Sequence, residues 1–255
     1  MKIAVVSYLN TIPFRYAIEK SPVKPVGVEY IYCPPSECAS LLINNKAQGG
    51  LIPVAAIPSL KKHYVFSDYC ISAYREAYSV VLLSQMPLSE IKTVILDYQS
   101  RSSVAMFKLL NQHYLHFNFD FVQGQENFEK QICGTTAGLV IGDRAMKYRM
   151  HAEYVYDLAE MWFEHTGLPA VFALWVSTVP VASQIKLAFD SMMQFGMKSV
   201  DEAIHYFNPA YDRELMHSYL TENLCYSLDS NRRNSVNLFL SLLNNGDFKT
   251  NFSFQ

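Results

Sequence analysis

Apolar runs and amphipathic stretches alternate through the first part of the chain. Residues 2–6, 26–32 and 51–54 are short apolar runs of the kind that form buried strands. Pro13 opens a helical stretch after the first run, and Ser36 is placed to cap a second helix after the next one. Strands that alternate with helices in this way predict mostly parallel sheets covered by helices, which is an α/β fold.

A second series of the same kind follows. Residues 79–84, 93–96 and 139–141 are predicted strands, and Pro87 marks a boundary after the first of them. Residues 170–177 form the last strong apolar run. Two groups of strands predict two lobes, and we expect the strands at 79–84 and 170–177 to cross between them.

The sequence after Pro180 has only helical patterns. One helix face is marked by Val236, Phe239, Leu240 and Leu243. Gly246 is placed as the C-cap of that helix. We therefore expect a discontinuous first lobe, made of residues 1–84 together with residues 178–255, and a second lobe made of residues 85–177.

The composition narrows the possible classes of function. The chain has 255 residues, of which 50% are hydrophobic, with 21 basic against 23 acidic residues. This length suffices for two modest lobes. The near-neutral net charge lacks the excess of basic residues that is typical of nucleic-acid-binding proteins. No apolar run approaches the roughly 18–20 residues of a membrane span, and the N-terminal run is too short for a secretory signal. We therefore expect a cytoplasmic protein that binds neither nucleic acid nor membrane.

The cysteine pattern and the absence of several short motifs argue against further classes of function. The five cysteines are an odd number with no C-x-x-C pair, which favours reduced thiols over disulfides or a zinc site. The motifs G-x-x-x-x-G-K-[ST], G-x-G-x-x-G and G-x-S-x-G are absent. The sequence thus predicts no metal site and gives no support to nucleotide binding or serine-hydrolase chemistry.

A turn rich in hydroxyl groups joins the predicted strand at residues 93–96 to a helix. Ser100, Ser102 and Ser103 lie where the helix begins, with Arg101 between them. The free N–H groups at a helix N-terminus attract carboxylate or phosphate, and an arginine can add a bidentate contact. The alternative is that these serines only cap the helix.

Two further polar segments follow predicted strands. Ser7 and Asn10 come after the first strand, and Gly142 and Asp143 come after the strand at residues 139–141. In open α/β sheets ligands gather at the carboxyl ends of strands, where an amide can donate and accept and a carboxylate can act as a base. Asn10 and Asp143 can instead be simple helix caps.

Short motifs in five segments occur in one order along the chain. They are Ser-Tyr-Leu-Asn-Thr-Ile-Pro at residues 7–13, Ile-Pro-Val at 52–54, Ser-Arg-Ser-Ser-Val at 100–104, Ile-Gly-Asp at 141–143, and Tyr-Asp-Leu, Trp, Thr-Gly-Leu-Pro and Phe-Ala-Leu-Trp between 156 and 175. This ordered set resembles the chorismate dehydratases of the futalosine route to menaquinone. The resemblance covers residues 1–178 and weakens through the C-terminal helices.

The resemblance implies a fold and a reaction. The fold is two-lobed and similar to type 2 periplasmic binding proteins, with the active site in the cleft between the lobes. The reaction converts chorismate to 3-[(1-carboxyvinyl)oxy]benzoate and water without a cofactor, so chorismate is the expected small-molecule partner. The sequence leaves monomer and homodimer both open.

The matched motifs also imply roles for the polar segments. Asn10 and Ser79 match positions in the cleft of the family, where they would hold the enolpyruvyl carboxylate and ether of chorismate. Ser102 and Ser103 would hold the ring carboxylate at the helix N-terminus. The full set of binding candidates is Ser7, Ser100, Arg101, Ser102, Ser103 and Gly142. The proton acceptor is either the enolpyruvyl carboxylate of the substrate or Asp143, which makes Asp143 the third catalytic candidate beside Asn10 and Ser79.

The chain departs from the family pattern at two places. Ala55 stands where the family usually has a hydroxyl residue, and residues 73–78 lack its Gly-x-Val segment, which bears on the fit of the substrate. Ser102 keeps the hydroxyl of the commoner threonine. Two alternatives stay open. One is a non-catalytic solute-binding or sensory domain of the same fold; the other is the sister 1,4-dihydroxy-6-naphthoate synthase, whose Cys-Pro-Asn-Asp motif is absent from residues 7–13.

Overall fold

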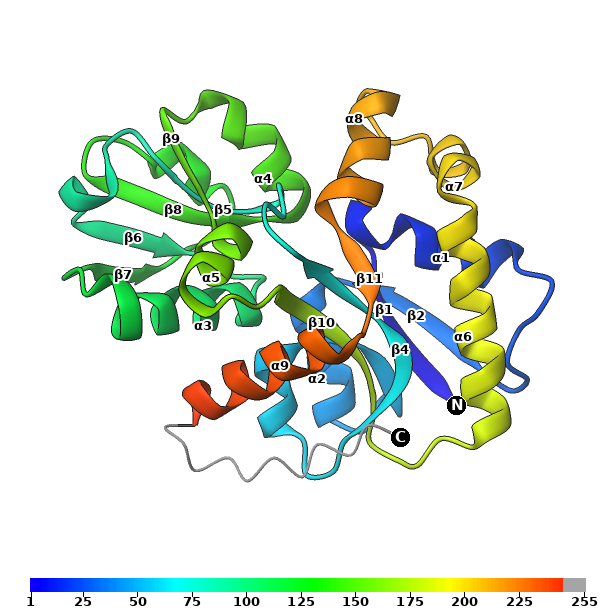
Figure 1. Cartoon of the computed structure of the whole chain (residues 1–255). Coiled ribbons are helices and arrows are strands. Elements are labelled where there is room, and N and C mark those ends of the chain that lie inside the picture. Colours follow the sequence, from blue (N-terminus) through cyan, green and yellow to red (C-terminus); the bar gives the residue numbers. More distant parts are fainter. Residues whose placement is uncertain (245–255) are drawn as a thin grey trace.

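The computed structural model describes residues 1–244, which form two β-sheets set side by side with helices around them (Figure 1). The strands are β1 (Lys2–Val6), β2 (Glu29–Cys33), β3 (Gly49–Pro53), β4 (Tyr64–Ala73), β5 (Val80–Ser84), β6 (Thr93–Leu96), β7 (Asp120–Gln123), β8 (Thr136–Ile141), β9 (Tyr154–Asp157), β10 (Ala170–Ser177) and β11 (Cys225–Ser227). The helices are α1 (Ile12–Lys20), α2 (Pro35–Ile43), α3 (Arg101–Leu110), α4 (Gly142–Tyr148), α5 (Leu158–Thr166), α6 (Ser183–Lys198), α7 (Val200–Phe207), α8 (Arg213–Ser218) and α9 (Ser230–Leu243).

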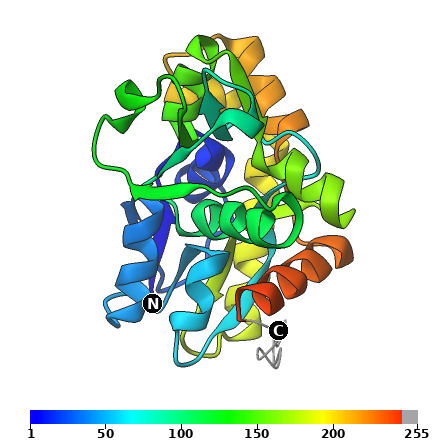
Figure 2. The same ribbon diagram turned by 90° about the vertical axis from the view of Figure 1, so that its left-hand side faces the viewer.

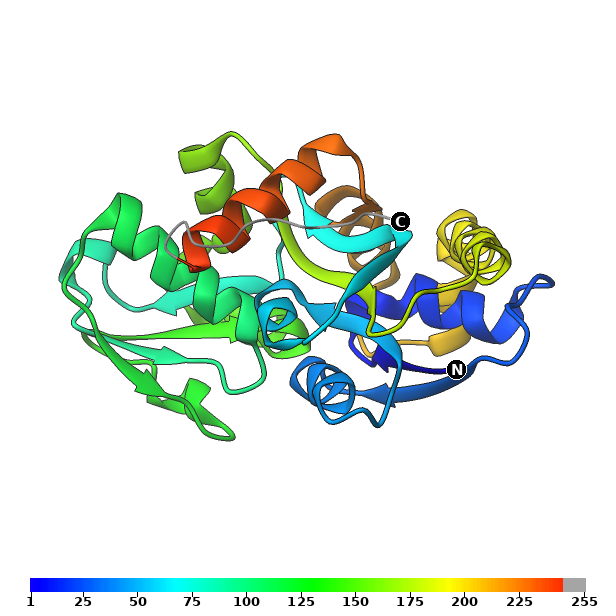
Figure 3. The same cartoon turned by 90° about the horizontal axis from the view of Figure 1, so that it is seen from below.

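Each sheet mixes parallel and antiparallel pairs. The six-stranded sheet of the first lobe has the order β11-β4-β10-β3-β1-β2, and the five-stranded sheet of the second lobe has the order β7-β6-β8-β5-β9. β1 is parallel to β2 and β3, and β6 is parallel to β7 and β8. β10 in the first sheet and β5 in the second run antiparallel to both of their neighbours. The predicted α/β architecture is confirmed, and the two lobes are distinct in the view from below (Figure 3).

The sheet pairing moves the predicted boundary between the lobes. The strand predicted at residues 79–84 was expected to cross from the first lobe, but residues 80–84 form β5 inside the second sheet. All five residues are buried, since β8 and β9 flank this strand and helices α4 and α5 pack against it. β10 lies wholly in the first sheet. The chain therefore changes sheets in the connection from β4 to β5 and returns in the connection from β9 to β10.

The C-terminal segment packs on both lobes. Helices α6 and α7 lie against α1, and α9 lies against β10 and also against α3 of the second lobe (Figure 2). This segment contains the edge strand β11, which corrects the expectation of helices alone after Pro180. The predicted cap at Gly246 lies outside the described residues. Among residues 1–244, no helix is both long enough and apolar enough to cross a membrane.

Trp175 on β10 is at the centre of the aromatic core of the first lobe. It is completely buried, and the rings of Phe14, Phe66 and Phe189 lie 5.6, 6.4 and 5.0 Å from its ring. These rings come from α1, β4 and α6, so the cluster joins both helices to strands β4 and β10 of the sheet. Large aromatic side chains stabilise a core through the area they bury and through edge-to-face contacts. The cluster therefore holds β10 rigidly where it borders the second lobe.

The close approach of α1 to α6 requires a glycine. A Cβ at Gly196 would lie 2.1 Å from the carbonyl oxygen of Pro13, which is backbone and cannot rotate away. We expect Gly196→Ala to lower the free energy of unfolding by about 3 kcal/mol, because overpacking a close helix contact forces the backbones apart. Urea unfolding measures this loss, and the exposed Gln194→Ala on the same helix serves as control, with an expected change within about 0.5 kcal/mol. An unchanged urea midpoint for Gly196→Ala would contradict this packing of α1 on α6.

Candidate active site

A cavity lies between the two sheets and is lined by both lobes. The first lobe contributes the residues that follow β1 and residues near the ends of β3, β4 and β10. The second lobe contributes the start of β5, the first turn of α3 and the junction of β8 with α4. The space between the lining atoms is about 600 Å³, a figure that includes open solvent at the mouth of the cavity. The carboxyl ends of β1 and β3 meet here, as expected for a ligand site in an α/β sheet.

Asn10 enters the cavity lining from a tight turn. It lies in the 3₁₀ turn Leu9–Thr11, directly after β1. The turn is fixed by the buried hydroxyl of Thr11, which is 2.6 Å from the carbonyl oxygen of Val6 and 2.7 Å from that of Tyr8. The side-chain oxygen Oδ1 of Asn10 is buried and has no hydrogen-bond partner among the described residues. Since an unpaired buried acceptor costs about 1–3 kcal/mol, a ligand that donates a hydrogen bond to it would be stabilised.

Ser79 and Gly142 form a packed part of the lining with Tyr8. The hydroxyl of Ser79 is 2.8 Å from that of Tyr219, and its carbonyl accepts a hydrogen bond from the Gly142 N–H at 2.7 Å. Gly142 has a φ of 62°, and a Cβ there would lie 2.9 Å from the ring of Tyr8. Only glycine combines that backbone conformation with that contact. The three residues therefore hold one another in place beside the cavity.

The N-terminus of α3 contributes a third part of the lining. Ser100 caps the helix, because its hydroxyl accepts a hydrogen bond from the Ser103 N–H at 3.1 Å. The Ser102 hydroxyl accepts from the Ala55 N–H at 3.2 Å and donates to the Phe172 carbonyl at 2.9 Å. Its proton is thus committed to the protein, whereas the Ser103 hydroxyl has no protein partner within residues 1–244. The helix dipole and the remaining N–H groups of this first turn favour an anion.

Three residues named from the sequence do not line this cavity. Ser7 is exposed, and Arg101 is exposed in a separate groove that also contains Lys108. The Asp143 carboxylate accepts a hydrogen bond from the Leu9 N–H at 3.2 Å, and its burial raises its pKa above the usual value. The structure brings together Asn10, Ser79, Ser100, Ser102, Ser103 and Gly142 around the cavity.

Hydrogen bonds between the lobes surround the cavity. The hydroxyl of Tyr8 in the first lobe donates to the side-chain oxygen of Gln99 in the second. The contact of Leu9 with Asp143 and the bridge made by Ser102 also join the two lobes. The two lobes are therefore in direct contact around the cavity.

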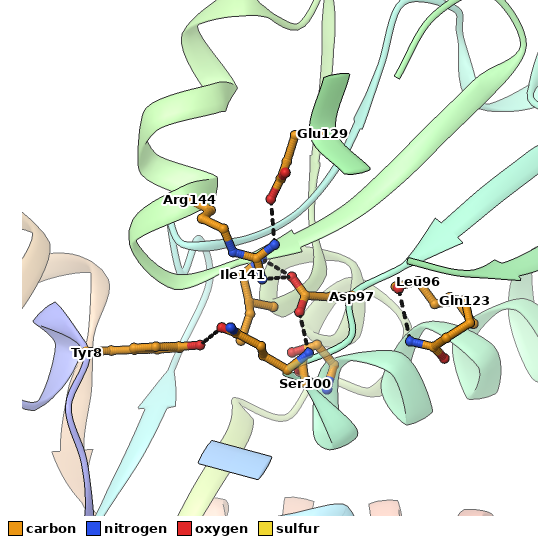
Figure 4. Close-up of polar contacts among 10 residues, drawn as sticks. Tyr8, Leu96, Asp97, Ser100, Gln123, Glu129, Ile141 and Arg144 are labelled. Atoms are coloured by element: carbon orange, nitrogen blue, oxygen red, sulfur yellow. Dashed lines mark hydrogen bonds and ion pairs between the residues drawn. The ribbon is translucent and has the colours of Figure 1, made fainter. Parts of the chain in front are cut away.

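A buried ion-pair network supports the turn before α3 (Figure 4). Asp97 is 2% exposed and accepts hydrogen bonds from the N–H groups of Gln99 at 2.8 Å and Ile141 at 3.2 Å. Arg144 pairs with Asp97 at 2.6 Å and also with Glu129. Burial raises the pKa of Asp97, and the charge of Arg144 opposes that rise. The network fixes the α3 turn relative to the junction of β8 with α4. Two parts of the cavity lining are therefore held in a constant relative position.

The polar groups that line the cavity are neutral. No charged side chain lines it within the described part of the chain. No group of three or more His, Cys, Asp or Glu side chains within residues 1–244 is placed to hold a metal ion. The lining offers an amide, hydroxyls and backbone N–H groups, which can bind and orient an anion. It offers no carboxylate or imidazole as a proton acceptor.

Two tyrosines of the C-terminal segment, Tyr219 and Tyr226, were not predicted as site residues. Tyr219 contacts the hydroxyl of Ser79, and the hydroxyl of Tyr226 donates to the backbone carbonyl of Asn10 at 3.0 Å. The partners are 140 and 216 residues apart along the chain. A local sequence pattern does not predict a contact between residues so far apart along the chain. The fold alone brings these residues together.

The chain is similar in sequence to a known protein family and to two named relatives. A family model described as menaquinone biosynthesis matches residues 1–245. A Thermus thermophilus protein named chorismate dehydratase is 26% identical over 188 residues, which cover 66% of each chain. A Campylobacter jejuni protein with the same name is 27% identical over 172 residues, which cover 66% of this chain and 63% of that protein. The match thus spans about two thirds of the length of these curated relatives.

Solved structures share the fold at low sequence identity. A protein from Archaeoglobus fulgidus has a TM-score of 0.76 at 15% identity and covers 96% of both chains. A Candida albicans gene product described as having the generic periplasmic binding protein fold has a TM-score of 0.62 at 15% identity, covering 100% of this chain and 98% of that one. The periplasmic aliphatic sulphonate binding protein of Escherichia coli has a TM-score of 0.55 at 10% identity, covering 94% and 91%. These likenesses confirm the predicted two-lobed fold and carry no information on function.

Proposed function

Because the chain belongs to the menaquinone biosynthesis family, we propose that it dehydrates chorismate to 3-[(1-carboxyvinyl)oxy]benzoate and water, as a carbon–oxygen lyase. The observation that carries this proposal is the interlobe cavity, where Asn10 and Ser79 lie with the N-terminus of α3 and where no residue of the described lining is charged. The names of the two curated relatives support the same reaction.

The ring carboxylate of chorismate would bind at the N-terminus of α3. The N–H groups of the first turn and the free Ser103 hydroxyl can donate to it, and the Ser100 hydroxyl can donate as well while it accepts the capping hydrogen bond. The Ser102 hydroxyl would serve instead to hold the second lobe against the first, because both of its hydrogen bonds are to backbone of the first lobe. An anion can thus be held without an arginine or a lysine in the cavity.

The enolpyruvyl group would lie beside Asn10 and Ser79. The Ser79 hydroxyl and the amide N–H₂ of Asn10 can donate to its carboxylate. The buried Oδ1 of Asn10 can at the same time accept a hydrogen bond from the ring hydroxyl of chorismate, which would satisfy its missing partner. The two residues would therefore fix the carboxylate and the leaving hydroxyl relative to each other.

In this arrangement the proton acceptor is the enolpyruvyl carboxylate of the substrate. It takes the ring proton, the electron pair of that C–H bond completes the aromatic ring, and the ring hydroxyl departs and is neutralised to water by the abstracted proton. The absence of a carboxylate or imidazole from the described lining supports this choice over a protein base. Catalysis would come from positioning the reacting groups and from excluding water, effects that can be very large in well-oriented intramolecular reactions.

Replacing Asp143 separates the two proton acceptors. We expect Asp143→Asn to retain kcat within about fivefold, because an asparagine oxygen can still accept the hydrogen bond from the Leu9 N–H. Loss of a protein base would instead cost about 100-fold to 10,000-fold. Steady-state kinetics with chorismate measures the effect. A fall in that larger range, with an unchanged melting temperature, would assign the base to Asp143.

Incubation of the purified protein with chorismate tests the proposed function. We expect the diene absorbance to decay and one equivalent of the enolpyruvyl benzoate to appear for each chorismate consumed. Saturable binding from which chorismate is recovered unchanged would defeat the proposal and favour a solute-binding or sensory domain. A protein that neither binds nor converts chorismate would defeat it as well.

A further inference from the structure

We propose that Tyr219 and Tyr226 are positioning residues, each of which orients one of the two polar side chains that act on the enolpyruvyl group. The proposal rests on the proposed function for its effect on turnover, whereas its structural content stands on the contacts of this segment alone. Both tyrosines belong to residues 219–227, a stretch that consists of the π-helical turn Tyr219–Asn223, Leu224 and β11.

This stretch reaches the cavity from the far end of the sequence. β11 pairs antiparallel with β4 at the edge of the first sheet, in the orange part of the ribbon in Figure 1. Leu224 lines the cavity itself. Tyr219 is 1% exposed and Tyr226 is 5% exposed, so both hydroxyls are inside the protein. The stretch therefore packs against Asn10 and Ser79 from inside the protein.

Tyr219 controls the direction of the Ser79 hydroxyl. The two hydroxyl oxygens are 2.8 Å apart, and the Tyr219 hydroxyl has no other hydrogen-bond partner among the described residues. If Ser79 donated, the buried phenolic proton would be left without an acceptor. When Tyr219 donates, that proton is satisfied and the proton of Ser79 is free to point at a ligand. Tyr219 thus turns Ser79 into a hydrogen-bond donor toward the cavity.

Tyr226 fixes the turn that carries Asn10. Its hydroxyl donates to the Asn10 carbonyl at 3.0 Å, and its ring packs edge-to-face on Phe14, with centroids 5.2 Å apart. The backbone of Asn10 is therefore tied to the aromatic core, while its amide stays free for a ligand. Burial raises the pKa of both Tyr219 and Tyr226 far above the usual value, so both remain hydrogen-bond donors at neutral pH.

Tyrosine-to-phenylalanine variants remove the hydroxyls and keep the rings. For Tyr219→Phe we expect kcat to fall about tenfold, with KM within about twofold of wild type. The reason is that the Ser79 hydroxyl loses the hydrogen bond that orients it toward the reacting enolpyruvyl carboxylate. Tyr226→Phe is expected to lower kcat by a similar factor. The control is Tyr30→Phe, a partly buried tyrosine whose hydroxyl is 3.9 Å from the sulfur of Met192, and its kcat should match wild type.

Crystal structures of the variants test the positioning without reference to turnover. In Tyr219→Phe the Ser79 hydroxyl should leave its wild-type rotamer or divide between rotamers, and in Tyr226→Phe the Asn10 carbonyl should shift. If Ser79 and Asn10 keep their wild-type positions, or if the kcat of Tyr219→Phe equals that of Tyr30→Phe, the proposal is overturned. If the wild-type protein does not convert chorismate, the proposed function fails while the position of Ser79 still decides this inference.

Discussion

Asn10→Ala is expected to abolish chorismate dehydration, with kcat reduced about 100-fold or more. Among the described residues that line the cavity, only the Asn10 amide combines a donor with an unpaired buried acceptor, and the substrate would use both. The effect on stability should be close to zero or slightly favourable, because the substitution removes a buried oxygen that has no partner among the described residues. Function and stability are therefore expected to separate at this residue.

Steady-state kinetics and thermal unfolding of Asn10→Ala measure the two effects together. Asn234→Ala, an exposed asparagine on α9, is the matched control and should leave both the turnover and the melting temperature unchanged. A kcat within about fivefold of wild type in Asn10→Ala would remove Asn10 from the mechanism, since a merely structural asparagine gives no such separation.

Ser103→Asp is expected to block chorismate binding, with KM raised about 100-fold or more. The new carboxylate would occupy the first turn of α3, where the ring carboxylate of the substrate is proposed to lie, and two like charges at one site cost several kcal/mol. The same substitution favours the helix itself, because an acidic side chain in the first turn interacts well with the helix dipole. Because Ser103 is buried, the new carboxylate also costs some stability, and thermal unfolding must show that the variant is folded when it fails to bind.

Steady-state kinetics with chorismate measures the KM of Ser103→Asp. Ser183→Asp, at the exposed start of α6, is the control for an added negative charge at a helix N-terminus and should bind as wild type does. Wild-type affinity in Ser103→Asp would mean that the substrate carboxylate lies elsewhere, for instance in the groove that contains Arg101 and Lys108.

The periodicity of apolar residues predicted the strands that are buried on both faces. β5 and β10 are uninterrupted buried runs, and these stand out in the sequence. β4 was not recognised because Ser67 and Asp68 interrupt its apolar pattern. β11 is three residues long and is a strand only because the edge of β4 is available to it. Short or polar strands are specified by their neighbours in the sheet, which a one-dimensional pattern does not contain.

The sequence predicted those site residues that lie within or next to a motif, and it missed those that only long-range contacts bring to the site. Asn10, Ser79 and the serines of the α3 turn lie in or beside motifs at strand ends, and all of them line the cavity. Arg101 shares the motif of these serines, but the helical rotation turns its side chain to another surface. The supporting tyrosines depend on contacts across most of the chain. Sequence motifs locate a backbone segment, and the direction of each side chain follows from the packing.

A crystal structure with the bound product, 3-[(1-carboxyvinyl)oxy]benzoate, tests most directly whether this cavity carries out the reaction. We predict the ring carboxylate at the N-terminus of α3, within hydrogen-bond distance of the Ser103 hydroxyl, and the enolpyruvyl carboxylate against Asn10 and Ser79. A product molecule bound outside the cavity between the lobes, or bound in it with the two carboxylates exchanged, would contradict the account.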